Sequence, residues 1–258
     1  MKWPTYLVLL RHAESQFNKF KKTLENDPQW QAFVAAYEAD FQSEKTKHLA
    51  GILQAQYKNL WRDRKISLTQ YGREVQAVKA GAYLKTQIDT PDVILVSPYE
   101  RCLKTLDGLR QGWPELENIP TYQEECLVER SIGLCLLYAH WRIFHVFHPE
   151  QKELYEQEGC YDYRYPQGDN MRDVNLRMKD LFDTIIREFH GKKVLGIAHG
   201  VSIMGFRTAQ ERLTEAEFVE LEQNNSPKNC SITLYRGDPT QGNDGRLVLE
   251  RYNETAPL

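Results

Sequence analysis

The sequence predicts an α/β fold, a three-layer sandwich in which helices cover both faces of a mostly parallel central sheet. Short apolar runs alternate with longer helical patterns along the 258 residues. Chemistry-bearing side chains directly follow several of these runs, which is where α/β proteins gather ligand groups. Two aromatic-rich stretches, 19–65 and 134–165, interrupt the alternation. We therefore expect a single domain, 1–258, with helical cap insertions at about these two places.

Five strands are expected from short runs of apolar residues. The first is a continuous apolar run of the kind that forms a buried strand, and Pro91 with Asp92 opens the second. The last two are expected to pair, because the turn-rich segment 237–245 separates them. The predicted strands are Thr5–Leu10, Val93–Val96, Lys193–Ala198, Cys230–Tyr235 and Arg246–Arg251.

Helices are expected between these strands. Thr69 is suited to cap a helix that runs to about Gln87. Ser97 and Pro98 are expected to be the N-cap and first residue of another helix. In 169–189 the apolar residues recur every three or four positions, which predicts one buried helix face. Its members are Met171, Val174, Met178, Leu181 and Ile185.

The two insertions are polar, helix-prone and rich in aromatic residues. Three interpretations stay open for them: they cover a pocket, form a surface for a partner, or pack a core of their own. The first contains Trp30, Phe33, Tyr37, Phe41, Tyr57 and Trp61, and the second contains Tyr138, Trp141, Phe144, Phe147, Tyr155, Tyr161, Tyr163 and Tyr165. His140, His145 and His148 lack the spacing and the acidic or cysteine neighbours of a metal site. We interpret them as spare histidines on a surface helix.

Composition excludes several classes of function. The net charge of −3 gives no basic face for nucleic acid or for a membrane surface. No apolar run approaches the roughly 20 residues that span a bilayer. The first residues lack the cleavage site of a signal peptide, so a cytoplasmic protein is expected. The five cysteines are irregularly spaced and include no CxxC pair, which indicates neither a disulfide framework nor a zinc site.

Five charged or titratable side chains fall at the ends of predicted elements. Arg11 and His12 follow the first strand, Arg101 follows the second, and His199 follows the third. Glu129 follows a further short segment. Each residue alone is more often a solvated surface group, but the joint pattern indicates a site for an anionic substrate.

At six linked places the sequence is similar to the histidine phosphatase, or phosphoglycerate mutase-like, superfamily, branch 1. Order and spacing agree from Thr5 to Tyr235, apart from a long first insertion. The matching segments are Arg11–Asn18, Leu68–Ala77, Ser97–Thr105, Glu129–Gly133, Pro166–Asn170 and His199–Ser202. Three further stretches, 124–126, 163–166 and 229–230, resemble a plant and fungal branch of broad-specificity phosphatase-like members.

The resemblance implies a phosphatase that hydrolyses a small phosphate monoester through a phosphohistidine on His12. Arg11, Arg101 and His199 would stabilise the charge of the transferring phosphoryl group. Glu129 would protonate the leaving oxygen and then activate water. No metal and no other cofactor is needed, because arginines supply the positive charge.

Four residues are expected to complete substrate binding. The resemblance places Ser15, Asn18 and the Gly200 amide in the phosphate cradle, the last aided by a helix N-terminus. Arg62 is a candidate for a distal anion on the substrate, although a solvated charged helix end is the preferred interpretation. A small phosphorylated molecule is the expected partner, and a homo-oligomer is left open.

Two alternatives remain. The first is mutase chemistry, in which the phosphoryl group returns to the retained sugar acid. True mutases carry tyrosine three residues after the catalytic glutamate, where this chain has Ile132. No counterpart is found to the arginine pair that grips their substrate carboxylate. Both departures favour hydrolysis. The second alternative is a regulatory or binding member of the family with little turnover.

Overall fold

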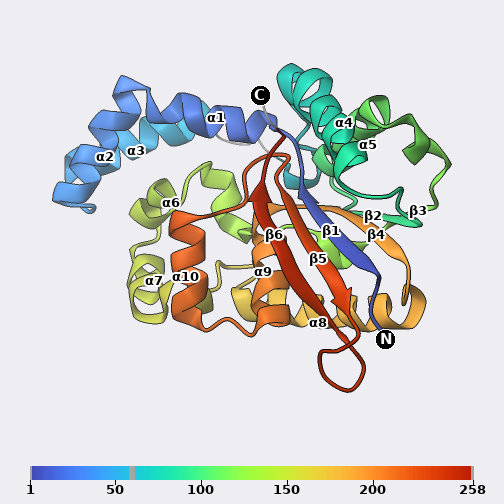
Figure 1. Ribbon diagram of the computed structural model, residues 1–258. Coiled ribbons are helices and arrows are strands. Elements are labelled where there is room, and N and C mark those ends of the chain that lie inside the picture. Colours follow the sequence, from blue (N-terminus) through green and yellow to red (C-terminus); the bar gives the residue numbers. More distant parts are fainter. Residues whose placement is uncertain (1, 58–61, 257–258) are drawn as a thin grey trace. The chain divides into compact units, whose positions relative to one another are not determined.

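Strands from distant parts of the chain form one six-stranded sheet in the computed structural model, which describes residues 2–57 and 62–256 (Figure 1). The strand order is β3-β2-β4-β1-β5-β6. The first four are mutually parallel, while β5 is antiparallel to both β1 and β6. The bounds are β1 Tyr6–Arg11, β2 Val93–Val96, β3 Thr121–Gln123, β4 Lys193–Ala198, β5 Ile232–Asp238 and β6 Arg246–Glu254. This mixed sheet confirms the α/β class and the predicted closing pair of strands.

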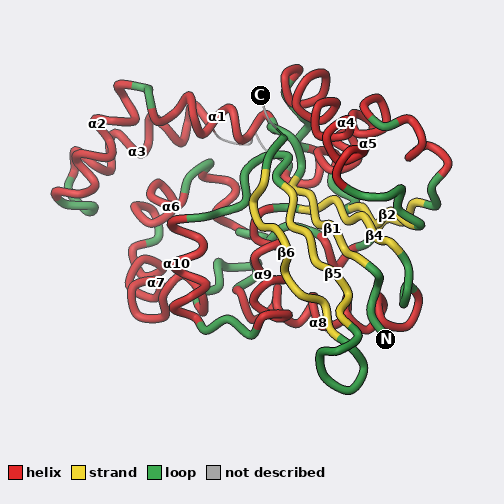
Figure 2. The backbone as a smooth tube through the Cα atoms, viewed as in Figure 1, coloured by secondary structure: helices red, strands yellow, loops and turns green. Residues whose placement is uncertain are grey.

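The described chain divides into two compact units. The first contains the sheet and is built from residues up to 15, 67–129 and from 173 onward. The second contains no strand among its described residues, as the tube in Figure 2 shows, and is built from 16–66 and 130–172. These bounds lie close to the expected insertions, which therefore form a helical body of their own.

Helices cover both faces of the sheet, which confirms the predicted sandwich. Alternate residues of β1 point to opposite faces. Val8 and Leu10 belong to the cluster packed by α4 and α5, whereas Leu7 and Leu9 belong to the cluster packed by α8 and α9. The helices of this unit are α4 Ala77–Gln87, α5 Glu100–Gly112, α8 Met171–Glu188, α9 Gly200–Glu211 and α10 Glu215–Asn224, with short turns η2 Gly72–Gln76, η3 Pro114–Asn118 and η4 Glu125–Leu127. The predicted apolar face of α8 is buried from Met171 to Ile185.

Two local expectations differ from the structure. Strand β3 was not expected, because its three side chains are all exposed and give no apolar signal. Ser97 is not a helix N-cap: α5 begins at Glu100 with Tyr99 as its N-cap. The Ser97 hydroxyl instead contacts His199, as described below. Thr69 does cap its helix, since its Oγ1 accepts a hydrogen bond from the Gly72 amide at 2.9 Å.

The helical unit has its own aromatic core. Trp30, Phe33 and Tyr37 pack with Ile143 and other apolar residues. Core packing therefore accounts for part of the aromatic content, although some rings stay exposed. Trp61 lies outside the described residues. The elements are α1 Gln16–Glu25, α2 Pro28–Ala39, α3 Glu44–Tyr57, η1 Asp63–Lys65, η5 Gly133–Tyr138, α6 Trp141–Phe147 and α7 Pro149–Asp162.

One histidine of this unit contradicts its sequence interpretation. His145 is not a spare surface residue, because only 1% of its surface is exposed. It faces inward because the short helix α6 buries Ile143, Phe144 and Val146 along with it. A sequence pattern that counts every histidine as a polar surface position misses a buried histidine of this kind.

Two further observations concern the whole described chain. No helix in 2–57 or 62–256 combines the length and the apolarity needed to cross a bilayer. All five cysteines carry free thiols, in keeping with their irregular spacing.

Candidate active site

The carboxyl ends of three neighbouring strands bring the predicted residues together. Arg11 at the end of β1 lies in register with Ala198 at the end of β4. The His12 amide donates to the Ala198 carbonyl at 2.9 Å, and the Ser97 amide donates to the Ile197 carbonyl at 3.0 Å. Since β1 and β2 both flank β4, the residues that follow all three strands meet at one edge of the sheet.

His12 is held as a neutral imidazole with one nitrogen directed to its own backbone. Its Nδ1 lies 2.7 Å from the Ala13 carbonyl oxygen, which can only accept, so Nδ1 carries the proton. The lone pair is therefore on Nε2. Burial lowers the pKa of His12 well below its usual range, and the charges of Arg101 and Arg11 lower it further. The arrangement suits a nucleophile.

His199 lies beside His12, with ring centroids 5.2 Å apart. Its Nδ1 accepts a hydrogen bond from Nε of Arg101 at 3.1 Å, and its Nε2 lies 2.8 Å from Oγ of Ser97. Burial lowers the pKa of His199 well below its usual range, and Arg101 is the next largest cause. The imidazole is therefore neutral in the free protein and helps to orient the Arg101 guanidinium.

Arg11 provides a second cation at this edge. Its Nη1 donates to the Pro227 carbonyl, and its guanidinium lies against the backbone of Gly200. Its buried Nε finds no hydrogen-bond acceptor among the described residues. Burial lowers the pKa of Arg11, while the nearby Glu129 carboxylate opposes that shift. An anion bound here would satisfy a donor that the protein leaves unpaired.

Glu129 is tied to the beginning of α9. Its Oε2 accepts a hydrogen bond from the Val201 amide at 3.4 Å. Gly200 is the first residue of α9, and His199 is its N-cap, so amides at a helix N-terminus face the same edge. The first unit thus contains His12, Arg11, Arg101, Glu129, His199 and Gly200.

The loop that carries His12 is fastened by residues that we did not single out from the sequence. Thr105 Oγ1 accepts from the Ala13 amide at 2.9 Å and donates to the Arg101 carbonyl at 2.6 Å. Asn229 Nδ2 donates to the His12 carbonyl at 3.0 Å. Both residues lie within motifs quoted above, but the motifs alone do not show which contact each side chain makes.

Glu14 and Ser15 support the same loop. The Glu14 amide donates to Oε1 of Gln76 at 2.7 Å, and its carboxylate accepts from the Thr69 hydroxyl at 3.1 Å. Ser15 is 2% exposed and pairs with Leu68 through an isolated antiparallel β-bridge of the backbone. Glu14 therefore has a structural role in this loop, and contact of Ser15 with substrate stays a prediction.

Two predicted substrate-binding residues belong to the helical unit. Asn18 lies in α1, and Arg62 is an exposed residue directly before η1. Their contact with substrate stays a prediction. Within the described ranges, no three histidine, cysteine, aspartate or glutamate side chains cluster closely enough to hold a metal ion.

The chain belongs to the histidine phosphatase superfamily, branch 1, whose family model matches residues 54–255. It is 28% identical over 193 residues to a phosphoglycerate mutase-like protein of Arabidopsis thaliana, covering 67% of this chain and 64% of that protein. A second such Arabidopsis protein is 26% identical over 210 residues, covering 74% and 62%. The chain thus spans somewhat under two thirds of the length of these relatives.

Solved structures share the fold at low sequence identity. A mycobacterial glucosyl-3-phosphoglycerate phosphatase, determined with inorganic phosphate, matches with a TM-score of 0.64 and 17% identity over 98% of both chains. The Bacillus stearothermophilus protein YhfR matches with a TM-score of 0.61 and 18% identity, covering 95% of this chain and 96% of that one. At these identities the likeness establishes the fold.

Proposed function

We propose that this protein is a metal-independent phosphatase that hydrolyses small phosphate monoesters through a phosphohistidine on His12. The observation that carries the proposal is the hydrogen bond from Nδ1 of His12 to the Ala13 carbonyl. It leaves a lone pair on Nε2 of a buried, neutral imidazole that is flanked by two guanidinium groups. Family membership and the phosphatase named among the structural relatives support the same chemistry.

In the first step Nε2 of His12 attacks phosphorus and the bond to the leaving oxygen breaks. Charge spreads over three equatorial oxygens of the phosphoryl group. Arg101 presents a planar guanidinium fork, and Arg11 adds the buried Nε–H that lacks an acceptor among the described residues. These donors are already oriented by His199 and by Pro227, so little reorganisation is required when the charge develops.

His199 adds a group whose charge responds to the substrate. In the free protein burial and the neighbouring arginines keep it neutral. A phosphate dianion placed beside His199 favours the protonated imidazole. Because protonated Nδ1 can no longer accept from Arg101, its N–H and the released Nε–H of Arg101 would both donate to phosphoryl oxygens. In this proposal His199 orients Arg101 before binding and adds positive charge after it.

Glu129 is the proton carrier in this proposal. It would donate a proton to the leaving alcohol and later remove one from the water that attacks phospho-His12. The Val201 amide, at the N-terminus of α9, holds one of its carboxylate oxygens. Release of inorganic phosphate then regenerates the neutral His12.

A trapping experiment tests the proposal. The full chain is incubated with p-nitrophenyl phosphate and with a panel of natural phosphate monoesters, then quenched in alkali. We expect an acid-labile phosphohistidine at His12 by mass spectrometry and release of inorganic phosphate. His12→Ala should abolish both, whereas His190→Ala, which removes an exposed histidine of the same unit, should leave both unchanged.

Four results would contradict the proposal. Phosphate release that persists in His12→Ala would exclude this nucleophile. Loss of activity in EDTA would contradict the metal-free mechanism. Phosphoryl transfer on 3-phosphoglycerate that exceeds hydrolysis would instead support the mutase alternative, in keeping with the name of the Arabidopsis relatives. A protein with no turnover on any ester would be the regulatory alternative. A cytoplasmic location remains a prediction of the sequence.

A further inference from the structure

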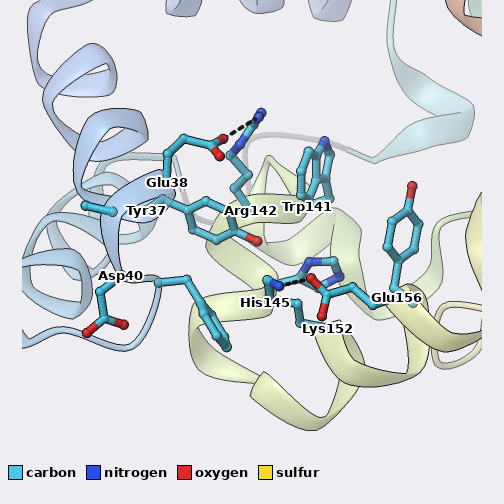
Figure 3. Close-up of a pocket in the computed structure, with 11 residues that line it drawn as sticks. Tyr37, Glu38, Asp40, Trp141, Arg142, His145, Lys152 and Glu156 are labelled. Carbon is cyan, nitrogen blue, oxygen red and sulfur yellow. Dashed lines mark hydrogen bonds and ion pairs between the residues drawn. The ribbon is translucent and has the colours of Figure 1, made fainter.

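The helical unit contains a pocket of its own, between α2, α6 and α7 (Figure 3). Its volume is about 560 Å³. All the side chains that line it belong to 16–66 and 130–172, so the pocket does not depend on the catalytic unit. Aromatic rings and charged groups share the lining, which is the mixture found in sites for small molecules.

Three side chains of this pocket have buried polar atoms without a hydrogen-bond partner among the described residues: His145, Tyr37 and, at its Nε, Arg142. Only 1% of the surface of His145 is exposed, and neither of its ring nitrogens has a hydrogen-bond partner among the described residues. The hydroxyl of Tyr37 is equally buried and is also unpaired in the described chain. Figure 3 shows this hydroxyl directed toward His145. Each buried group that lacks a hydrogen bond costs about 1–3 kcal/mol, which a ligand would recover.

The charges of the pocket do not favour an anion. Arg142 forms an ion pair with Glu38 at 3.0 Å, and Lys152 forms an ion pair with Glu156. With Asp40 included, the acidic groups of the lining outnumber the basic ones. Both cations are therefore already in ion pairs, although Nε of Arg142 makes no hydrogen bond among the described residues, and an added phosphate or carboxylate would meet net negative charge.

A cationic ligand is not favoured either, because cationic side chains of the lining already lie over two of its aromatic rings. The Arg142 guanidinium lies 4.4 Å from the ring centroid of Trp141, and the Lys152 ammonium lies 4.7 Å from that of Phe41. Those ring faces already make the contacts that an ammonium ligand would seek. An uncharged ligand remains as the class that fits.

The remaining ring surfaces suit a flat apolar face. Trp141 and Tyr155 lie within 18° of parallel with centroids 6.4 Å apart. The Arg142 guanidinium covers one face of Trp141, but this residue is still 36% exposed, so part of its surface stays open to a ligand. A sugar ring combines an apolar C–H face with hydroxyl groups around its edge. Each sugar hydroxyl can both donate and accept a hydrogen bond. Neutral His145 has one donor and one acceptor nitrogen, and the hydroxyl of Tyr37 can do either, so both side chains can pair with sugar hydroxyls.

We propose that this pocket binds an uncharged, hydroxylated ring, either a free sugar or the glycosyl part of a larger molecule. Its hydroxyls pair with His145 and Tyr37, and its C–H face packs on Trp141 or Tyr155. The site is additional to the proposed phosphatase chemistry and would exist whether or not His12 is a nucleophile.

Ligand-observed saturation-transfer NMR on the full chain tests this site. The probes are methyl α- and β-pyranosides of glucose, mannose and galactose, a disaccharide, adenosine, choline and inorganic phosphate. We expect saturation transfer to at least one glycoside, strongest at its C–H face. Transfer to a disaccharide through only one ring would point to a terminal glycosyl group as the natural source, and equal transfer to the monosaccharide would point to a free sugar.

Two variants connect binding to the unpaired groups. Tyr37→Phe removes only a hydroxyl, and His145→Leu removes both ring nitrogens. Each should raise the Kd for the glycoside about tenfold or more, as expected for a lost buried hydrogen bond. Neither should lower the Tm of the free protein, because neither variant removes a hydrogen bond among the described residues. Tyr122→Phe, at an exposed tyrosine in the other unit, is the matched control and should change nothing.

The outcomes that overturn the proposal are distinct. They are no transfer to any glycoside, preferential binding of adenosine, choline or phosphate in this pocket, or equal weakening by Tyr122→Phe. A large fall in Tm for Tyr37→Phe or His145→Leu would show a structural role and would also overturn it. Hydrolysis of p-nitrophenyl phosphate by each variant separates this site from the proposed catalytic one, since the two proposals fail independently.

Discussion

Nε of Arg101 donates a hydrogen bond to Nδ1 of His199, across 3.1 Å. Because Nδ1 accepts, the proton of the neutral imidazole lies on Nε2, and Nε2 donates it to Oγ of Ser97. The chain Ser97–His199–Arg101 therefore fixes the tautomer of a buried histidine and the direction of a guanidinium at once. The three residues come from different elements: Ser97 follows β2, His199 follows β4, and Arg101 lies in the first turn of α5.

Ser97→Ala should lower kcat without unfolding the protein. It removes the hydroxyl acceptor of a buried N–H and leaves only the weak acceptor Sγ of Cys102, at 3.4 Å. The loss costs about 1–3 kcal/mol and corresponds to about five- to 150-fold if it is felt in the transition state. Steady-state kinetics with p-nitrophenyl phosphate measures the loss, and 15N shifts of the His199 ring report its tautomer. Ser202→Ala is the contrast, because that hydroxyl contacts only the backbone of His199. A proton on Nδ1 of His199 in the parent protein would contradict the assignment, and an unchanged kcat in Ser97→Ala would contradict the role given to Ser97.

Glu129→Gln should affect the two half-reactions unequally. p-Nitrophenolate leaves without a proton, so phosphorylation of His12 by this ester should continue. Alkyl phosphates need the acid, and hydrolysis of the phosphoenzyme needs the base, so both should slow by about 10²–10⁴-fold. Rapid-quench measurement should show the phosphohistidine accumulating. If the variant forms phosphohistidine from alkyl and aryl esters with the same rate ratio as the parent protein and none accumulates, Glu129 is not the proton carrier.

Gly72→Ala should destabilise the loop that carries His12. A Cβ at this position would lie 2.3 Å from the Glu14 carbonyl oxygen, so the backbone on one side must move. Overpacking of this kind typically costs about 1–3 kcal/mol, or several degrees in Tm. Calorimetry measures the shift, and kcat should fall with it. Gly51→Ala in α3 is the control, since nothing lies within 4 Å of its added Cβ. A Tm loss as large in Gly51→Ala would refute the argument.

Stability should fall as the pH is lowered from about 7. Burial lowers the pKa of His12 and His199 well below the usual range, and burial with the Lys152 charge lowers the pKa of His145 to about 4. The unfolded chain therefore takes up protons near pH 6.5 that the folded state does not, and each histidine costs up to about 1.4 kcal/mol per pH unit below that value.

Urea unfolding between pH 7.5 and 5.5 measures this dependence. His145→Leu should flatten the slope, because one of the buried histidines no longer titrates. His190→Leu replaces an exposed histidine and should leave the slope unchanged. A slope that stays the same in His145→Leu would mean that this imidazole titrates normally in the folded state.

Much of the fold was predictable because its strands are buried on both faces. Val93–Val96 and Lys193–Ala198 read as continuous apolar runs, and the structure gives the same bounds. Strand β3 lacked this signal, since its pairing depends on backbone contacts with β2 and its side chains face outward. The prediction of Ser97 as the N-cap of α5 was wrong for another reason. The hydroxyl of a serine before proline can also form a hydrogen bond with a residue far away in the sequence, and here that residue is His199.

The sequence by itself determined the α/β class, the residues at the strand ends and their family, because these depend on local patterns and on residue identity. Tertiary structure decided which atoms meet. The tautomer of His12, the unpaired Nε of Arg11 and the two unpaired groups at Tyr37 and His145 all arise from packing between segments far apart in the chain. A local pattern places a residue on an element, whereas only the assembled elements determine its neighbours and hence its charge.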